Sequence, residues 1–298
     1  MAHRVLTLVS TAVLLLTASI AYSQEKLSVY AVNYPLQYFA QRIAGEQAEV
    51  TLPVPAAIDP AFWQPDVAAI ANFQQANIIL LNGAGYAKWV NRVSLPRRKL
   101  VDTSAGFRDR YIHTEGDVTH SHGREGDHSH AGAAFTTWLD FTLAVEQARA
   151  VAGALSRQRP GSKDVFEHNL ALLEKDLLDL DRQVQEIVAT DPDKLLLASH
   201  PVYQYFKRRY GLNLQSVMWE PEAIPDTAQW SAVARLLMEH PARWMVWEGK
   251  PAPESVTRLR RMDIDSLVFD PCGNRPGAGD FLSVMQQNIA NLRQAYTN

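Results

Sequence analysis

The sequence predicts an α/β protein with two lobes, each built on a parallel sheet, joined by one long backbone helix. Three observations predict it. Short apolar runs alternate with helix-length segments in the first half of the chain, and the same alternation returns in the last third. Between them, apolar residues recur every three or four positions over about seven turns of helix.

The first half contains four apolar runs that read as strands, separated by amphipathic or polar segments. Strands of this kind, apolar on both faces and alternating with helices, are typical of a buried parallel sheet. The predicted strands are 27–32, 49–54, 78–82 and 100–104, and the predicted helices are 35–44, 65–75 and 86–93.

The last third repeats this arrangement, which predicts a second lobe of the same class. Its predicted strands are 195–199, 214–218, 244–248 and 266–270, and its predicted helices are 201–210, 227–240, 253–262 and 280–295.

Two helices are predicted between the lobes, over 138–158 and 163–190, with the sequence RPGS separating them. The apolar seam of the second comprises Phe166, Leu170, Leu173, Leu177, Leu180, Val184 and Ile187. At about 1.5 Å per residue this helix is roughly 40 Å long, too long for a crossover within one lobe. We therefore expect a strut between lobes 24–158 and 195–298, with 159–194 as the link. A long surface helix within one domain is the alternative.

The N-terminal residues 1–23 resemble a secretory signal peptide. Arg4 precedes an apolar stretch, and Ala21, Tyr22 and Ser23 put small residues at the −3 and −1 positions of a cleavage site. A retained signal anchor is the alternative. The single cysteine, Cys272, excludes an internal disulfide, which suits the bacterial periplasm. We expect an exported, soluble, periplasmic monomer.

Composition and motifs restrict the class of function. The net charge of −3 gives no basic surplus for nucleic acid. The chain has no GxSxG nucleophile elbow, no phosphate-binding GxxxxGK[ST] loop and no HExxH zinc-protease helix. We therefore expect a binding protein and not an enzyme.

The loop 113–132, HTEGDVTHSHGREGDHSHAG, is rich in histidine, glycine and acidic residues. Imidazole suits zinc, copper, nickel and iron, and an H-x-H pair can chelate one ion. We predict an auxiliary metal-collecting loop; an inert polar linker or a pH buffer is the alternative. Its histidines are His113, His120, His122, His128 and His130.

Several segments, in this order, resemble the metal-binding receptors of ABC importers, the TroA/ZnuA-like group. They are AVNYPLQYFAQRIAG (31–45), 52–90, TTWLDFTLAVEQARAV (136–151), SHPVYQYFKRRYGL (199–212), EPEAIPDTAQW (220–230) and FDPCGN (269–274). The acidic histidine loop stands where zinc-type members have theirs. The resemblance implies two lobes bridged by a long helix, a metal ion in the cleft between them, and delivery of that ion to an ABC permease.

The resemblance also implies which residues hold the ion. His200 and Asp270 match the family's positions, whereas Asp59 and Thr136 stand where two histidines are usual. The implied cleft ligands are thus His200, Asp270 and Asp59. Zn²⁺ is the expected ion, and Mn²⁺ or another divalent ion is the alternative.

Three accounts of this altered cleft stay open. In the first, a loop histidine, His130, completes a zinc site. In the second, carboxylates select a harder ion such as manganese or iron. In the third, an organic or chelated-metal ligand binds among Trp63, Trp138 and Trp219, although at least two of these tryptophans are expected to fill cores. A periplasmic metal chaperone or buffer without a transporter is a further alternative. Glu220 and Glu222 are expected to reach the rim of the cleft. Docking of the receptor onto its transporter, or simple exposure to solvent, explains these two glutamates equally well.

Overall fold

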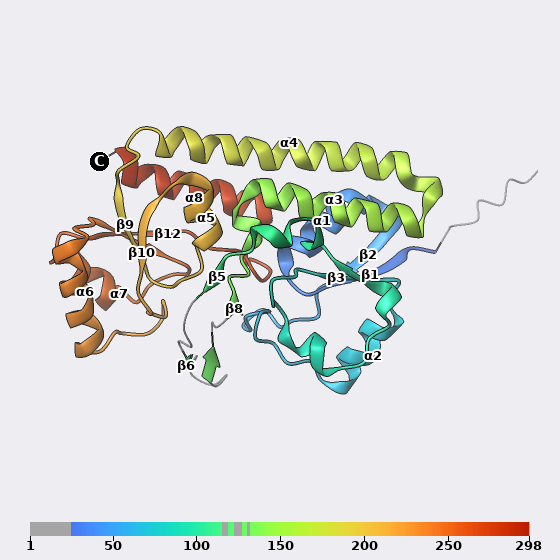
Figure 1. Cartoon of the computed structure of the whole chain (residues 1–298), viewed down its shortest axis with the longest axis horizontal. Coiled ribbons are helices and arrows are strands. Elements are labelled where there is room, and N and C mark those ends of the chain that lie inside the picture. Colours follow the sequence, from blue (N-terminus) through green and yellow to red (C-terminus); the bar gives the residue numbers. More distant parts are fainter. Residues whose placement is uncertain (1–24, 115–118, 122–126, 130–131, 298) are drawn as a thin grey trace, which may run out of the picture.

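Two four-stranded parallel sheets form the core of the two lobes (Figure 1). The computed structural model describes residues 25–114, 119–121, 127–129 and 132–297. The first sheet has the order β2-β1-β3-β4 and the second the order β10-β9-β11-β12, with every neighbouring pair parallel. The predicted fold class is confirmed in both halves.

The strands begin and end within three residues of their predicted limits. Those of the N-terminal lobe are β1 (Leu27–Ala31), β2 (Ala48–Thr51), β3 (Ile78–Leu81) and β4 (Leu100–Asp102). Those of the C-terminal lobe are β9 (Leu195–Ala198), β10 (Asn213–Ser216), β11 (Trp244–Trp247) and β12 (Asp265–Val268).

Several helices begin directly after a capping side chain. Asn33 caps α1 (Tyr34–Ala44), Asp66 caps α2 (Val67–Gln75), and Asp226 forms a capping box with Gln229 at α6 (Thr227–Glu239). The remaining α-helices are α3 (Phe141–Gln158), α4 (Lys163–Val188), α5 (Gln204–Tyr210), α7 (Pro253–Arg260) and α8 (Phe281–Thr297).

The predicted helix 86–93 is wrong. The chain instead forms a 3-10 turn over Lys88–Arg92. Gly83, Ala84 and Gly85 all adopt positive φ, and so does Ala87 inside the predicted span, so a regular helix cannot start where the prediction placed it.

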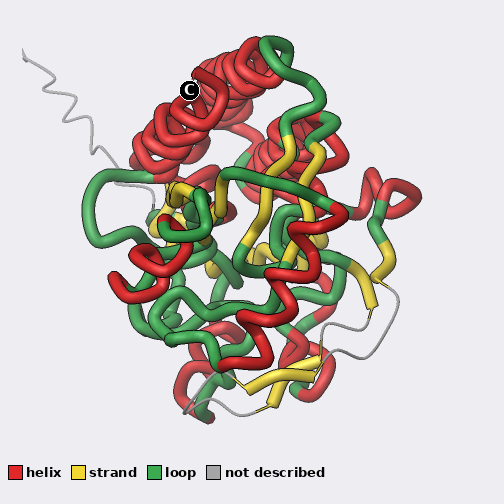
Figure 2. Tube along the Cα trace, turned by 90° about the vertical axis from the view of Figure 1, so that its left-hand side faces the viewer, coloured by secondary structure: helices red, strands yellow, loops and turns green. Residues whose placement is uncertain are grey.

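The long helix α4 packs against helices of both lobes. It contacts α1 and α3 on the N-terminal side and α5 and α8 on the C-terminal side. Every predicted seam residue is buried, except Leu170, which is half-buried against the same core. Figures 1 and 2 show α3, α4 and α8 gathered along one side of the molecule, with the sheets beneath them. The predicted strut is confirmed, and the alternative of a helix confined to one domain is wrong.

Asp181 anchors this strut to the C-terminal lobe. Its carboxylate accepts two hydrogen bonds from the Arg209 guanidinium, at 2.9 and 2.6 Å, and one from the buried Tyr210 hydroxyl at 2.9 Å. The Asp181 side chain is only 7 % exposed. A buried, hydrogen-bonded ion pair of this kind fixes one arrangement of α4 against α5.

Asp181→Ala should lower the free energy of unfolding by about 3 kcal/mol, because it leaves the Arg209 charge and the Tyr210 hydroxyl without their acceptor. Urea denaturation measures this change. Asp179→Ala is the matched control on the same helix. Its carboxylate is 43 % exposed and pairs with Lys175 at the surface, where solvent screens the interaction, so its removal should change stability far less. Equal effects of the two substitutions would contradict the anchoring role of Asp181.

A second connection between the lobes lies beside the candidate cleft. After β12, the Asn274 amide donates to the carbonyls of Pro55 and Ile58, both at 2.8 Å, and Arg275 donates to the carbonyl of Val54 at 2.7 Å. These bonds hold the loop that precedes Asp59 against the C-terminal lobe.

None of the helices within the described part of the chain combines the length and apolar character needed to span a bilayer. The predicted signal peptide, residues 1–23, lies outside the described residues.

Candidate metal centre

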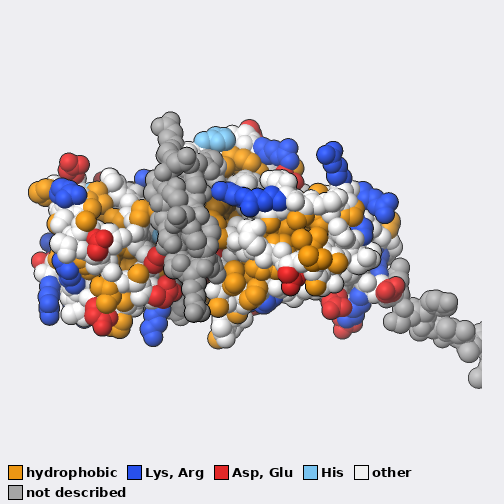
Figure 3. Space-filling model, turned by 90° about the horizontal axis from the view of Figure 1, so that it is seen from below, with side chains coloured by type: hydrophobic (Ala, Val, Ile, Leu, Met, Phe, Trp, Pro, Cys, Tyr) orange, Lys and Arg blue, Asp and Glu red, His pale blue; other side chains and the backbone are white. Residues whose placement is uncertain are grey.

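A cavity of about 880 Å³ lies between the lobes. Five carboxylates and one imidazole line it, and the lining residues that the structure describes include no lysine or arginine. The acidic side chains are Asp59, Glu220, Glu222, Glu248 and Asp270, and the imidazole belongs to His200. On the outer face shown in Figure 3, by contrast, acidic, basic and apolar side chains are interspersed. The cavity is therefore a local concentration of negative charge.

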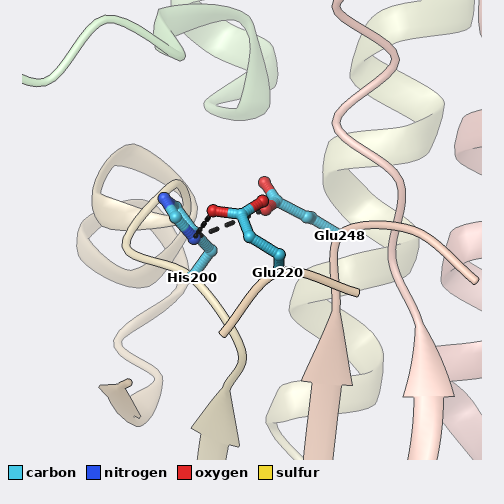
Figure 4. Close-up of side chains that lie close together, drawn as sticks. All are labelled: His200, Glu220 and Glu248. Carbon is cyan, nitrogen blue, oxygen red and sulfur yellow. Dashed lines mark ion pairs between the residues drawn. The ribbon is translucent and has the colours of Figure 1, made fainter. Parts of the chain in front are cut away.

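Three of these side chains converge at the carboxyl edge of the second sheet (Figure 4). His200 follows β9, Glu220 follows β10 and Glu248 follows β11. From β9 the chain continues to β10 at one edge of the sheet, and from β11 it continues to β12 at the opposite edge, so the connections diverge between β9 and β11. Such a topological switch point is where open α/β sheets bind ligands.

Backbone hydrogen bonds fix the positions of the three loops relative to one another. The Trp219 N–H donates to the Ser199 carbonyl at 2.7 Å, which sets Glu220 beside His200. The Ala252 N–H donates to the Pro221 carbonyl at 2.8 Å, which ties the segment after Glu248 to the segment after Glu220. The arrangement of the three side chains thus follows from the sheet and its connections.

The His200 Nδ1 atom lies 3.6 Å from a carboxylate oxygen of Glu220 and 3.6 Å from one of Glu248. The candidate ligand atoms all lie within 4.8 Å of one another. The His200 side chain is 3 % exposed, whereas those of Glu220 and Glu248 are 29 % and 20 % exposed, so the carboxylates remain open to the cavity. We call His200, Glu220 and Glu248 the three-residue cluster.

The electrostatics of the cavity favour a cation. Burial raises the pKa of Glu248 well above its usual value, and the negative charges of Glu220, Asp59, Glu222 and Asp270 raise it further. Burial also raises the pKa of Asp270, against the opposing hydrogen bond from the Cys272 N–H. A positive ion in the cavity would relieve both the desolvation and the mutual repulsion of these carboxylates.

The other two predicted cleft ligands line the same cavity but lie outside the three-residue cluster. Asp59 accepts a hydrogen bond from the Ala61 N–H at 2.8 Å, and Asp270 accepts one from the Cys272 N–H at 2.7 Å. Each carboxylate therefore shapes its own loop. Their roles as ligands stay predictions.

Sequence reasoning missed Glu248 and placed Glu220 only at the rim. Glu248 is the last residue of the predicted strand 244–248, where it read as part of the strand. The carboxyl ends of the strands in an open α/β sheet are where ligands bind, and this rule directs attention to polar residues after β10 and β11 as well as to His200 after β9.

The aromatic and threonine positions divide between cavity and core. Trp63 packs against Phe73 and Trp89, and Trp219 against Trp230 and Trp247, so two of the three tryptophans fill cores, as expected.

Trp138 lines the cavity and donates its Nε1–H to the Pro271 carbonyl at 2.7 Å. Thr136 is buried and donates its hydroxyl hydrogen to the Val202 carbonyl. The other aromatic residues of the wall are Phe62, Tyr86 and Phe135.

Only part of the predicted histidine loop lies within the described residues. The exposed His113 belongs to β5 (His113–Thr114), which pairs antiparallel with β8 (Gly132–Ala133). Strands β6 (Thr119–Ser121) and β7 (Asp127–Ser129) also pair antiparallel, with His120 opposite His128 in the register. His122 and His130 lie outside the described residues. Metal collection by this loop stays a prediction.

Solved structures with this fold are available for comparison. The metal-dependent lipoprotein YcdH from Bacillus subtilis superposes with a TM-score of 0.79 and 21 % identity, over 92 % of this chain and 100 % of that one. The Zn(II)-bound AdcA from Streptococcus pneumoniae superposes with a TM-score of 0.77 and 20 % identity, over 92 % of this chain and 58 % of that one. These neighbours share the arrangement of two lobes and a long helix.

Sequence comparison gives matches that also extend along most of the chain. The zinc-binding lipoprotein AdcA of Streptococcus pneumoniae R6 is 25 % identical over 287 residues, which is 90 % of this chain but only 56 % of that protein. The high-affinity zinc uptake system protein ZnuA of Bacillus subtilis is 25 % identical over 229 residues, which is 75 % of this chain and 71 % of that protein. This chain thus spans little more than half the length of AdcA. A family model matches residues 29–295, nearly the whole described chain, and on that match the chain belongs to the ZnuA family, described as the periplasmic component A of the zinc-uptake complex.

Proposed function

We propose that this protein is a zinc-binding receptor for metal uptake, with the ion held in the cavity between the lobes. The observation that carries the proposal is the concentration of five carboxylates and the His200 imidazole around a cavity whose described lining has no lysine or arginine. The zinc-binding names of AdcA and ZnuA support zinc as the ion. ZnuA-like solute-binding proteins are receptors, not enzymes.

His200 supplies the nitrogen donor in this proposal, and Asp270 and Asp59 contribute negative charge from the two sides of the cavity. Asp59 belongs to the N-terminal lobe, whereas His200 and Asp270 belong to the C-terminal lobe. An ion between them would attract both lobes, so binding should stabilise the folded protein. Mn²⁺ is the alternative ion, because carboxylates suit it better than they suit zinc.

The location and partner are also proposed. Residues 1–23 would direct export, and the protein would act in the periplasm as a monomer that delivers its ion to the permease of an ABC importer. The periplasmic description of the family supports this location. Zinc-dependent stimulation of the ATPase activity of a reconstituted importer would test delivery. A receptor that binds zinc but stimulates no importer would instead be a metal chaperone or buffer.

Zinc titration of the metal-free protein tests the binding itself. Calorimetry should show one tight site in addition to any weaker ones. At an ion concentration one hundred times Kd, stabilisation should reach about 2.7 kcal/mol, measurable as a rise in Tm. If neither zinc nor manganese raises Tm, the proposal fails, and an organic or chelated-metal ligand on the wall formed by Phe62, Tyr86, Phe135 and Trp138 becomes the better candidate.

Replacing residues 115–131 by Asn-Gly should abolish ion binding at the weaker sites and leave the tight site intact. The antiparallel pairing of Thr114 with Gly132 provides the ends that a two-residue hairpin turn can join. Calorimetric stoichiometry, with and without the replacement, checks this prediction. An unchanged number of bound ions would mean that the loop does not collect metal. Loss of the tight site as well would mean that a loop histidine such as His130 completes it.

A further inference from the structure

The spacing within the three-residue cluster suits a shared ion better than a hydrogen bond. The separation of 3.6 Å between His200 Nδ1 and each glutamate oxygen exceeds the 2.7 to 3.2 Å of an N–H···O hydrogen bond. Two ligand atoms that each lie about 2.1 Å from one ion, at a tetrahedral angle, are about 3.4 Å apart. Both separations from His200 are close to that value.

All three donors stand on one lobe. His200, Glu220 and Glu248 follow three neighbouring strands of the second sheet, and the hydrogen bonds between their loops fix them relative to one another. Asp59, in contrast, reaches the cavity from the other lobe. A centre built on one rigid sheet is organised before the ion arrives, so it loses little entropy on binding.

The donor set is rich in oxygen. Two carboxylates and one imidazole form a harder set than the nitrogen- and sulfur-dominated sets of closed zinc sites, and carboxylate and water ligands suit manganese. The cavity of about 880 Å³ also has room for water to complete a shell of six ligands around such an ion.

We propose that His200 Nδ1, Glu220 and Glu248 form the primary ion centre, and that this centre accepts Mn²⁺ and Fe²⁺ as well as Zn²⁺. The inference rests on the proposed function of a divalent-cation receptor and assigns its inner ligands and its ion class. In this assignment Asp59 and Asp270 attract the ion at longer range. Discrimination in favour of zinc is weak at this centre, because only one of its three protein donors is nitrogen.

The assignment is tested in the variant that carries the Asn-Gly loop replacement, which removes four of the five loop histidines and leaves only His113. Zn²⁺ and Mn²⁺ affinities are measured by competition with a fluorescent chelator. Glu220→Gln and Glu248→Gln should each weaken both ions at least tenfold. Glu239→Gln is the matched control, since it removes the same charge from an exposed position on α6 outside the cavity lining, and it should change affinity less than threefold. Circular dichroism of each metal-free variant confirms folding.

Glu220→His provides an independent measurement, because it exchanges an oxygen donor for a nitrogen donor. The ratio of Zn²⁺ to Mn²⁺ affinity should rise at least tenfold if Glu220 touches the ion. An unchanged ratio would overturn the assignment. So would wild-type affinity in both glutamine variants together with a large loss in Asp59→Asn and Asp270→Asn, which would place the ion at those aspartates and leave the proposed function intact. Absence of binding by the unsubstituted protein would reject the proposed function itself.

Discussion

His200→Ala should weaken zinc binding by about 100-fold or more and abolish most of the rise in Tm that zinc produces. His200 is the one imidazole among the described residues that line the cavity, and its ring is almost completely buried with Nδ1 directed at the two glutamates. Altering the partners that merely orient a metal ligand typically costs 10- to 100-fold in affinity, so losing the nitrogen donor itself should cost at least the upper part of that range.

The measurement is calorimetry and thermal unfolding in the background that lacks 115–131. His168→Ala is the matched control, because it removes one imidazole from the exposed face of α4 and should leave zinc affinity unchanged. Since alanine leaves a void at a buried position, His200→Gln is measured in parallel, and the metal-free Tm separates loss of folding from loss of binding. If His200→Gln is folded and retains wild-type affinity, the cavity is not the metal site.

The strands and the strut could be predicted because their sequences satisfy one simple rule each. Strands such as 244–247, buried on both faces, are almost entirely apolar, and the seam of α4 repeats at helical spacing. Local turns were harder to predict. The helix expected at 201 begins only at Gln204, because Pro201 and a turn in which the Val202 N–H donates to the His200 carbonyl come first.

The candidate site was predicted less completely, and the reason is topological. His200, Glu220 and Glu248 are separated by 20 and 28 positions in the sequence, and no local motif joins them. They meet only because β9, β10 and β11 are neighbours in one sheet and their carboxyl ends share an edge. His200 was identified through a family resemblance at one strand end, whereas strand order, which the sequence alone does not state, was needed for the two glutamates.

The same cluster that would bind an ion should destabilise the metal-free protein. Burial and four neighbouring carboxylates raise the pKa of Glu248, which means that the folded protein holds the proton on Glu248 more tightly than the unfolded chain does. As the pH rises from the ordinary glutamate pKa of about 4.3 to the raised pKa in the folded state, the folded protein therefore loses stability relative to the unfolded chain. Below this range the group is neutral in both states and has no effect.

Glu248→Gln should therefore raise the free energy of unfolding of the metal-free protein at pH 8, and this gain should shrink toward zero as the pH falls to about 4. Urea denaturation across this pH range, with chelator present, measures the difference, and Glu239→Gln controls for removal of an exposed charge that lies outside the cavity lining. With saturating zinc the order should reverse, because the bound ion stabilises the wild-type carboxylate and binds the glutamine variant more weakly. A wild-type protein more stable than Glu248→Gln at pH 8 without metal would contradict this account. The reversal follows from one cause, since the negative charge that the empty cavity disfavours is the charge that an incoming cation neutralises.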